Sequence, residues 1–71
     1  MPHVQITMLE GRTTEQKRRV AERVTRLLAE EIGTAPEGVS VAFVEVPRDS
    51  FARGGVLIAD RPAPKPHPGK Q

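Results

Sequence analysis

The eight residues from 39 to 46, VSVAFVEV, constrain the fold of this chain more than any other stretch. As an extended strand, it is apolar on both faces, which carry Val39, Val41 and Phe43 on one side and Ala42, Val44 and Val46 on the other. A strand of this kind is typical of a parallel sheet, because both faces of such a sheet are covered. The remaining residues must therefore supply a second parallel strand and a cover for each face.

Two segments before this strand predict a second strand that pairs with it and a helix that covers one face of the sheet. His3 to Leu9, HVQITML, alternates apolar and polar residues with the period of a half-buried strand. Thr13 with Gln16 three residues later forms a capping-box pattern. Apolar residues then recur at helical spacing up to Ile32, and Gly33 is a typical stop. The pattern predicts a helix from about Thr14 to Ile32 and a right-handed β-α-β crossover.

One helix covers only one face of the sheet, and the chain has few other means of stabilisation. Its 71 residues form one domain with a thin core. The chain has no cysteine, so it has neither disulfides nor thiolate ligands. Its two histidines, His3 and His67, lie near opposite ends of the sequence. Association of subunits is therefore the expected source of the missing burial.

The C-terminal third divides into a short apolar segment and a tail. Pro47 to Arg53 is expected to be a loop, and Gly54-Gly55 precedes the run Val56 to Ile58, a terminal strand or hairpin that docks on a neighbouring subunit. From Arg61 the sequence RPAPKPHPGKQ has four prolines and no core-forming residue. These patterns predict a domain over residues 1–60 and a disordered tail over 61–71, in which His67 is a solvated residue.

Charge and hydropathy exclude several classes of function. The net charge is only +2 and the only aromatic residues are Phe43 and Phe51, which argues against a nucleic-acid-binding module. Basic residues do cluster in the helix, but glutamates are interleaved with them, as in a solvated charged face. No apolar run approaches the ~20 residues of a membrane span, and no signal-peptide pattern is visible. We expect a soluble cytoplasmic protein without membrane or nucleic-acid partners.

Pro2 has two possible roles at the start of the first strand. It can be an edge residue, tolerated because it lacks an amide donor. If Met1 is removed, however, Pro2 becomes a secondary amine at the chain terminus and can act as a base. An α-amino group titrates near 7.7–8.0, and apolar walls or nearby guanidinium groups lower that pKa toward the working pH.

Several short motifs occur in an order that resembles the 4-oxalocrotonate tautomerase family. They are Pro2, Leu9-Glu10-Gly11-Arg12, Glu15-Gln16-Lys17 and Phe51-x-x-Gly54-Gly55. The resemblance runs from about Pro2 to Leu57. It implies an α+β fold in which short β-α-β subunits with parallel strands assemble as a hexamer, either a homohexamer (a trimer of dimers) or a heterohexamer with a paralogous chain. It also implies cofactor-free and metal-free catalysis, in which Pro2 moves a proton between carbon and oxygen atoms of an enolic 2-oxo acid.

The resemblance also assigns roles around Pro2. Arg12 would bind the distal carboxylate of the substrate, since its planar fork grips a carboxylate with two parallel bonds. The alternative is an ordinary surface arginine at a loop. Phe51 would form part of an apolar wall, and Leu9 would line the substrate site. A seven-residue strand is ~23 Å long, so Pro2 and Arg12 of different subunits are expected to share each site.

The sequence departs from the family pattern at Ser40. Well-known members carry a second active-site arginine there, and a serine supplies no positive charge to the substrate. Three explanations remain open. Arg53 reaches the site and substitutes for it; a paralogous partner chain supplies the arginine, which would make this chain a non-catalytic or half-equipped subunit; or the substrate differs. Candidate substrates are 2-hydroxymuconate, phenylenolpyruvate and, for a dehalogenase- or hydratase-type member, halogenated acrylates.

Overall fold

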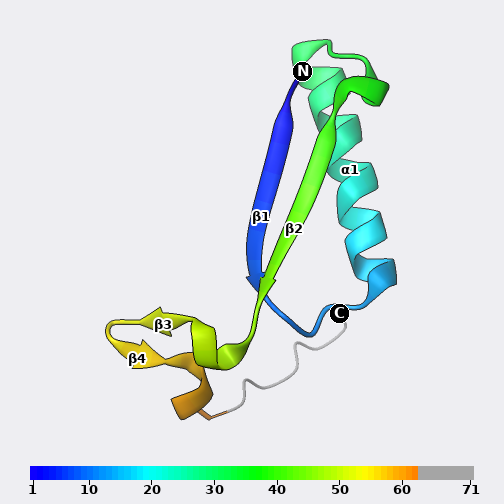
Figure 1. The fold of residues 1–71 in the computed structure, drawn as a ribbon. Coiled ribbons are helices and arrows are strands. Elements are labelled where there is room, and N and C mark those ends of the chain that lie inside the picture. The colour runs from blue at the N-terminus through cyan, green and yellow to red at the C-terminus, as the bar shows by residue number, and fades with distance from the viewer. Residues whose placement is uncertain (63–71) are drawn as a thin grey trace.

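A computed structural model describes residues 1–62 of the chain and shows a strand, a long helix, a second strand and a short hairpin (Figure 1). The elements are β1 (His3–Leu9), α1 (Thr14–Ile32), β2 (Ser40–Val46), β3 (Ala52–Arg53) and β4 (Val56–Leu57). Most of the tail expected over residues 61–71, including His67, lies outside the described residues.

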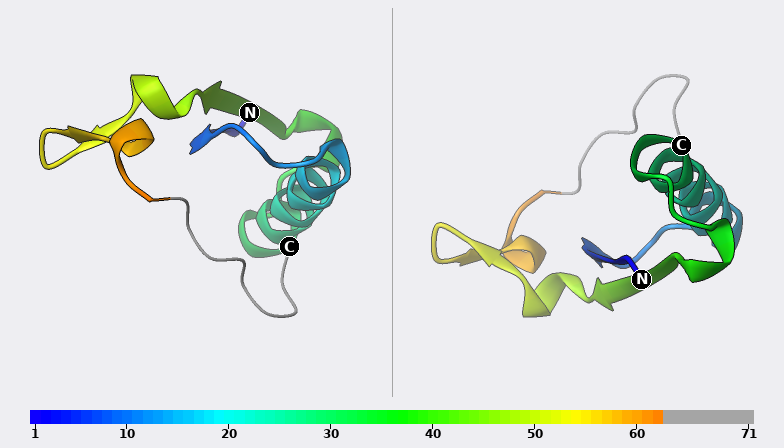
Figure 2. Two further views of the ribbon diagram at one scale, coloured as in Figure 1. Left: turned by 90° about the horizontal axis from the view of Figure 1, so that it is seen from below. Right: turned by 90° about the horizontal axis from the view of Figure 1, so that it is seen from above.

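The two long strands form the predicted parallel pair. β1 and β2 are paired in register from His3 opposite Ser40 to Leu9 opposite Val46. The helix connects them and lies against one face of this pair (Figure 2). Phe43 and Glu45 of β2 face its first turns, and Lys17 Nζ donates to Glu45 Oε1 at 2.9 Å. The β-α-β arrangement expected from the sequence is therefore confirmed.

The helix begins and ends where its capping residues dictate. Thr13 Oγ1 accepts a hydrogen bond from the Gln16 backbone N–H at 3.0 Å, and Gln16 Oε1 accepts one from the Thr13 N–H at 2.9 Å. This reciprocal pair satisfies two backbone donors that have no partner within the helix. At the other end, Gly33 adopts a left-handed conformation with φ of 70°, which only glycine reaches without steric cost.

The second face of the sheet is not covered by α1, which lies on the first face. It carries Ala42, Val44 and Val46 of β2, and Val44 is 39% exposed. None of the described residues is buried. The radius of gyration is 15.2 Å, whereas a compact domain of this length has about 11 Å. The described residues of a single copy therefore have no closed core of their own. None of the described helices is long and apolar enough to cross a membrane.

Residues 51–60 form an arm that extends from the end of β2, away from α1 (Figure 1). In this arm β3 and β4 pair antiparallel around Gly54 and Gly55, whose φ values of 61° and 82° suit a two-residue hairpin turn. The expected loop from Pro47 to Arg53 is thus wrong for its last two residues, which form β3 because the glycine turn folds them back onto β4.

One arginine ties the end of the arm to its base. Arg48 Nη2 donates to the carbonyl of Ile58 at 3.0 Å and to that of Arg61 at 3.4 Å. Within the arm, the Ile58 N–H donates to the Phe51 carbonyl at 2.8 Å. The arm is therefore held together by local hydrogen bonds, and not by packing against α1.

Candidate active site

Pro2 lies immediately before β1 and is fixed by the neighbouring strand. Its carbonyl accepts a hydrogen bond from the Ser40 N–H at 3.1 Å, and the residue is half-buried. Met1 before it is fully exposed. Removal of Met1 would therefore leave the amine of Pro2 at a defined position at one end of the sheet.

Ser40 stands beside Pro2 and holds a second side chain there. The strand register places Ser40 opposite His3, and His3 Nδ1 lies 2.6 Å from Ser40 Oγ. Both residues are exposed. The sequence did not identify His3 as a site residue, because its position depends on the register of two strands 37 residues apart. The only local signal was the alternation in β1, which puts His3 on the polar face with Gln5 and Thr7.

Leu9 and Arg12 occupy the opposite end of the sheet. Leu9 is the last residue of β1, and Arg12 is exposed in the loop that leads to α1. Gly11 before it has a φ of 125°, a conformation that favours glycine. Because β1 spans roughly 23 Å at 3.3 Å per residue, a single chain does not bring Arg12 and Pro2 together.

Phe51 and Arg53 lie in the arm, which also starts from the end of the sheet remote from Pro2 (Figure 1). Phe51 is half-buried at the base of the hairpin, and Arg53 is exposed in β3. The carbonyl of Arg53 accepts a hydrogen bond from Arg61 Nη2 at 2.8 Å. Within one chain, the structure thus groups Pro2 with Ser40 and leaves the other four predicted residues at the far end.

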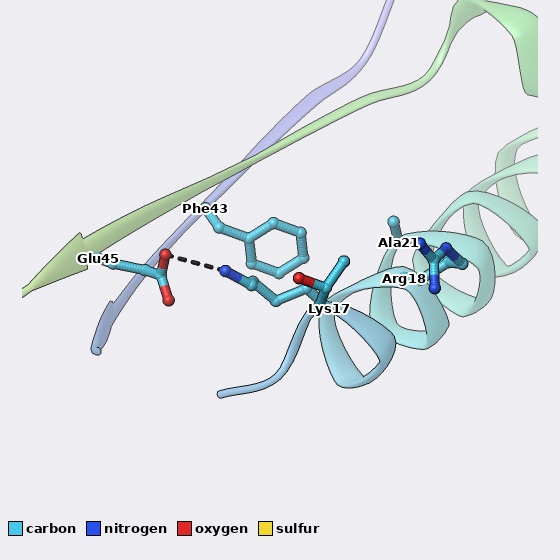
Figure 3. Close-up of a pocket in the computed structure, with 6 residues that line it drawn as sticks. Lys17, Arg18, Ala21, Phe43 and Glu45 are labelled. Atoms are coloured by element: carbon cyan, nitrogen blue, oxygen red, sulfur yellow. Dashed lines mark hydrogen bonds and ion pairs between the residues drawn. The ribbon is translucent and has the colours of Figure 1, made fainter. Parts of the chain in front are cut away.

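An open groove runs between the first turns of α1 and the end of β2 (Figure 3). It has a volume of about 450 Å³ and is lined by Thr14, Lys17, Arg18, Ala21, Phe43 and Glu45. None of the six predicted site residues is among them. Lys17 is engaged by Glu45 across the groove, and Arg18 is paired with Glu15 on the same helix. The Lys17–Glu45 pair therefore links the helix to the sheet, whereas the Arg18–Glu15 pair stays within the helix.

The described residues offer no cluster of three or more His, Cys, Asp or Glu side chains that could hold a metal ion. The groups at the Pro2 end include the proline nitrogen, the His3 imidazole and the Ser40 hydroxyl. They can transfer a proton and donate or accept hydrogen bonds. At the far end, Arg12 and Arg53 can bind anions.

Comparison with known proteins gives a consistent result. Residues 2–61 match the family model described as tautomerase enzyme. The 2-hydroxymuconate tautomerase of Bacillus subtilis is 42% identical over 60 residues, which cover 84% of this chain and 97% of that protein.

Solved structures resemble the chain in fold as well as in sequence. A crystal structure of a 4-oxalocrotonate tautomerase homologue has a TM-score of 0.83 and 40% identity, covering 89% of this chain and all of the other. A heterohexamer 4-oxalocrotonate tautomerase from Chloroflexus aurantiacus has a TM-score of 0.79 and 35% identity, covering 84% of this chain and 97% of that one.

Proposed function

The chain belongs to the tautomerase family, and from that premise we propose that it is a cofactor-independent keto–enol tautomerase of an enolic 2-oxo acid. Pro2, exposed as the amino terminus once Met1 is removed, is the general base. The observation that carries the proposal is the fixed position of Pro2 beside a fully exposed Met1. The substrate class follows the relatives named for 2-hydroxymuconate, and phenylenolpyruvate is the second candidate.

The proposed reaction moves one proton from oxygen to carbon in two steps. The free amine of Pro2 takes the proton of the enol hydroxyl, the oxygen–hydrogen bonding pair forms the carbonyl, and the double-bond electrons shift toward a carbon atom. The resulting ammonium group returns the same proton to that carbon. Atoms and electrons balance without a redox partner, so the base needs only correct placement and a pKa near the working pH.

The remaining predicted residues bind and enclose the substrate in this proposal. Arg12 grips the distal carboxylate of a dicarboxylate substrate, Phe51 and Leu9 supply apolar walls, and Arg53 is a further cation on the arm. All four lie at the end of the chain remote from Pro2, so each site combines residues of neighbouring chains. Excluding water with such walls strengthens every electrostatic contact inside the site.

We propose that the chain assembles as a hexamer with copies of itself or with a paralogous chain. Three features of the described residues support assembly: no residue is buried, the apolar face of β2 is uncovered, and the arm extends away from α1. A similar chain from Chloroflexus aurantiacus belongs to a heterohexamer. Ser40 motivates the mixed assembly, because a partner chain would supply the missing arginine.

The decisive experiment is kinetic. The intact mass of the purified protein first shows whether Met1 has been removed. Ketonisation of 2-hydroxymuconate and phenylenolpyruvate is then followed by absorbance for the wild type, Pro2→Ala and Pro62→Ala. We expect Pro2→Ala to lower kcat/KM at least ~10²-fold, the scale of general-base catalysis. Pro62→Ala, a proline exchange at an exposed position outside the site, should match the wild type.

Two results would contradict the proposal. Equal rates for wild type and Pro2→Ala would show that Pro2 is not the base, and a protein that retains Met1 would have no free proline amine. An inactive homo-oligomer that gains activity only with a paralogous, arginine-bearing chain would instead establish the half-equipped subunit.

A further inference from the structure

We propose that His3 and Ser40 form one substrate-binding pair, which holds the oxygen atoms at the 2-oxo acid end of the substrate beside Pro2. The inference rests on the proposed function and adds two named residues to its site. It also offers an answer to the missing arginine from within the chain, without a second kind of subunit.

The geometry of the pair is set by the sheet. Ser40 makes two contacts with the start of β1: its N–H donates to the Pro2 carbonyl at 3.1 Å, and its Oγ lies 2.6 Å from His3 Nδ1. His3 follows Pro2 directly in the sequence and stands opposite Ser40 in the parallel register. The pair is therefore tied through covalent and backbone bonds to the residue that would carry the reactive amine.

The pair presents a free hydrogen-bond donor whichever way its proton is arranged. If Ser40 donates to Nδ1 of a neutral His3 ring, Nε2 carries a proton and is the free donor. If Nδ1–H donates to Ser40 instead, the hydroxyl proton is free and Nε2 accepts. In both arrangements the short contact orders the two side chains, so less conformational freedom is lost when a ligand binds.

The free donor of the pair also suits a carboxylate, because a hydrogen bond to an ionised acceptor is stronger than a neutral one. The two predicted arginines lie at the far end of the chain, where they suit a distal carboxylate. The arrangement thus assigns one end of a dicarboxylate to each set of residues.

The test compares two substrates that share only one end. Both 2-hydroxymuconate and phenylenolpyruvate carry the 2-oxo acid group when ketonised, but only 2-hydroxymuconate has a distal carboxylate. His3→Phe and Ser40→Ala should lower kcat/KM about five- to tenfold for both substrates, mainly through KM, the scale of one lost hydrogen bond. Arg12→Ala should affect 2-hydroxymuconate alone. The double variant His3→Phe/Ser40→Ala should lose little more than either single variant, because each change already breaks the pair.

Matched variants separate binding from folding. Gln5→Ala removes a polar side chain from the same face of β1, and its kinetics should match the wild type. Ser40→Thr keeps the hydroxyl and suits a strand, so it should retain most of the activity. Native mass spectrometry of each variant checks that the assembly is unchanged. A variant that is only misfolded would show an altered assembly.

Three outcomes decide the matter. If His3→Phe and Ser40→Ala stay within about twofold of the wild type while Pro2→Ala is inactive, the pair has no binding role and the proposed function stands. If their losses appear only with 2-hydroxymuconate, the pair binds the distal end and the inference is wrong. If the wild type ketonises neither acid, the proposed function fails. The inference fails with it unless pyruvate shifts the His3 imidazole NMR signals in the wild type and not in Ser40→Ala.

Discussion

At the scale of single residues, Thr13 and Gly33 define the length of the one helix. Thr13 and Gln16 exchange hydrogen bonds at its first turn, and Gly33 turns the chain out of the helix with a positive φ. These are local interactions within three or four residues of each other. The helix from Thr14 to Ile32 was therefore predictable from the sequence to its ends.

Replacing Thr13 by alanine should weaken the protein measurably. Thr13→Ala removes the acceptor for the Gln16 N–H, so the free energy of unfolding should fall by about 1 kcal/mol per protomer, within the usual 0.5–2 range for a lost cap. Urea denaturation measures this free energy. The protomer concentration is kept fixed, because assembly makes stability depend on concentration. Thr14, the next residue, makes neither of the two capping hydrogen bonds, so Thr14→Ala should lower the free energy of unfolding by clearly less. Equal losses for the two variants would show that the cap is not the cause.

The contact between His3 and Ser40 marks the limit of prediction at this scale. Alternation placed His3 on the polar face of β1, but nothing local determines which residue of β2 stands opposite. His3 and Ser40 are 37 positions apart in the sequence, and their register depends on the connection between the strands and on how α1 packs. A side-chain pair between distant strands is therefore a product of tertiary structure, and sequence reasoning found only one of its two members.

At the scale of elements, the arm is a hairpin whose shape follows from its turn and its local hydrogen bonds. Gly54 and Gly55 make the turn, and Arg48 binds the carbonyls at its end. The sequence left a strand or a hairpin open after the glycine pair, and the hairpin is confirmed. The role of Arg48 was not predictable, because its partners are backbone carbonyls that carry no sequence signal.

Removing the guanidinium group of Arg48 should loosen the arm. In Arg48→Ala the carbonyl of Ile58 loses its donor, so the Ile58 N–H, which donates to the Phe51 carbonyl, should exchange with deuterium about five- to tenfold faster. Hydrogen exchange followed by NMR gives the rate residue by residue. Arg26→Ala removes an exposed arginine from α1 and serves as the control. An unchanged rate at Ile58 would mean that contacts with a neighbouring copy, and not Arg48, fix the arm.

At the scale of the whole molecule, the candidate site is spread over the length of the chain. Pro2, His3 and Ser40 lie at one end of the sheet, and Arg12, Phe51 and Arg53 at the other. From the length of β1 alone, the sequence predicted the separation of Pro2 from Arg12. It could not predict which copy meets which, because the relevant surfaces belong to the assembly.

Two variants with defects in different residues should complement each other if sites combine chains. Pro2→Ala and Arg12→Ala are co-expressed with different affinity tags and purified through both tags in turn. With random mixing about one site in four joins an intact Pro2 to an intact Arg12 of another chain. Activity on 2-hydroxymuconate should therefore rise well above that of either variant alone. No gain in the doubly purified protein would show that both residues of a site come from one chain.

The absence of any buried residue among those described bears on the life of the chain in a cell. A newly made copy has no interior of its own to resist unfolding, so until it meets partners it resembles the substrates of proteases and chaperones. Its survival then depends on how fast copies encounter one another, which rises with their concentration. Chains made at a low rate would be degraded before they assemble, and chains made at a high rate would assemble and survive. The amount of working protein would therefore rise only above a threshold rate of translation.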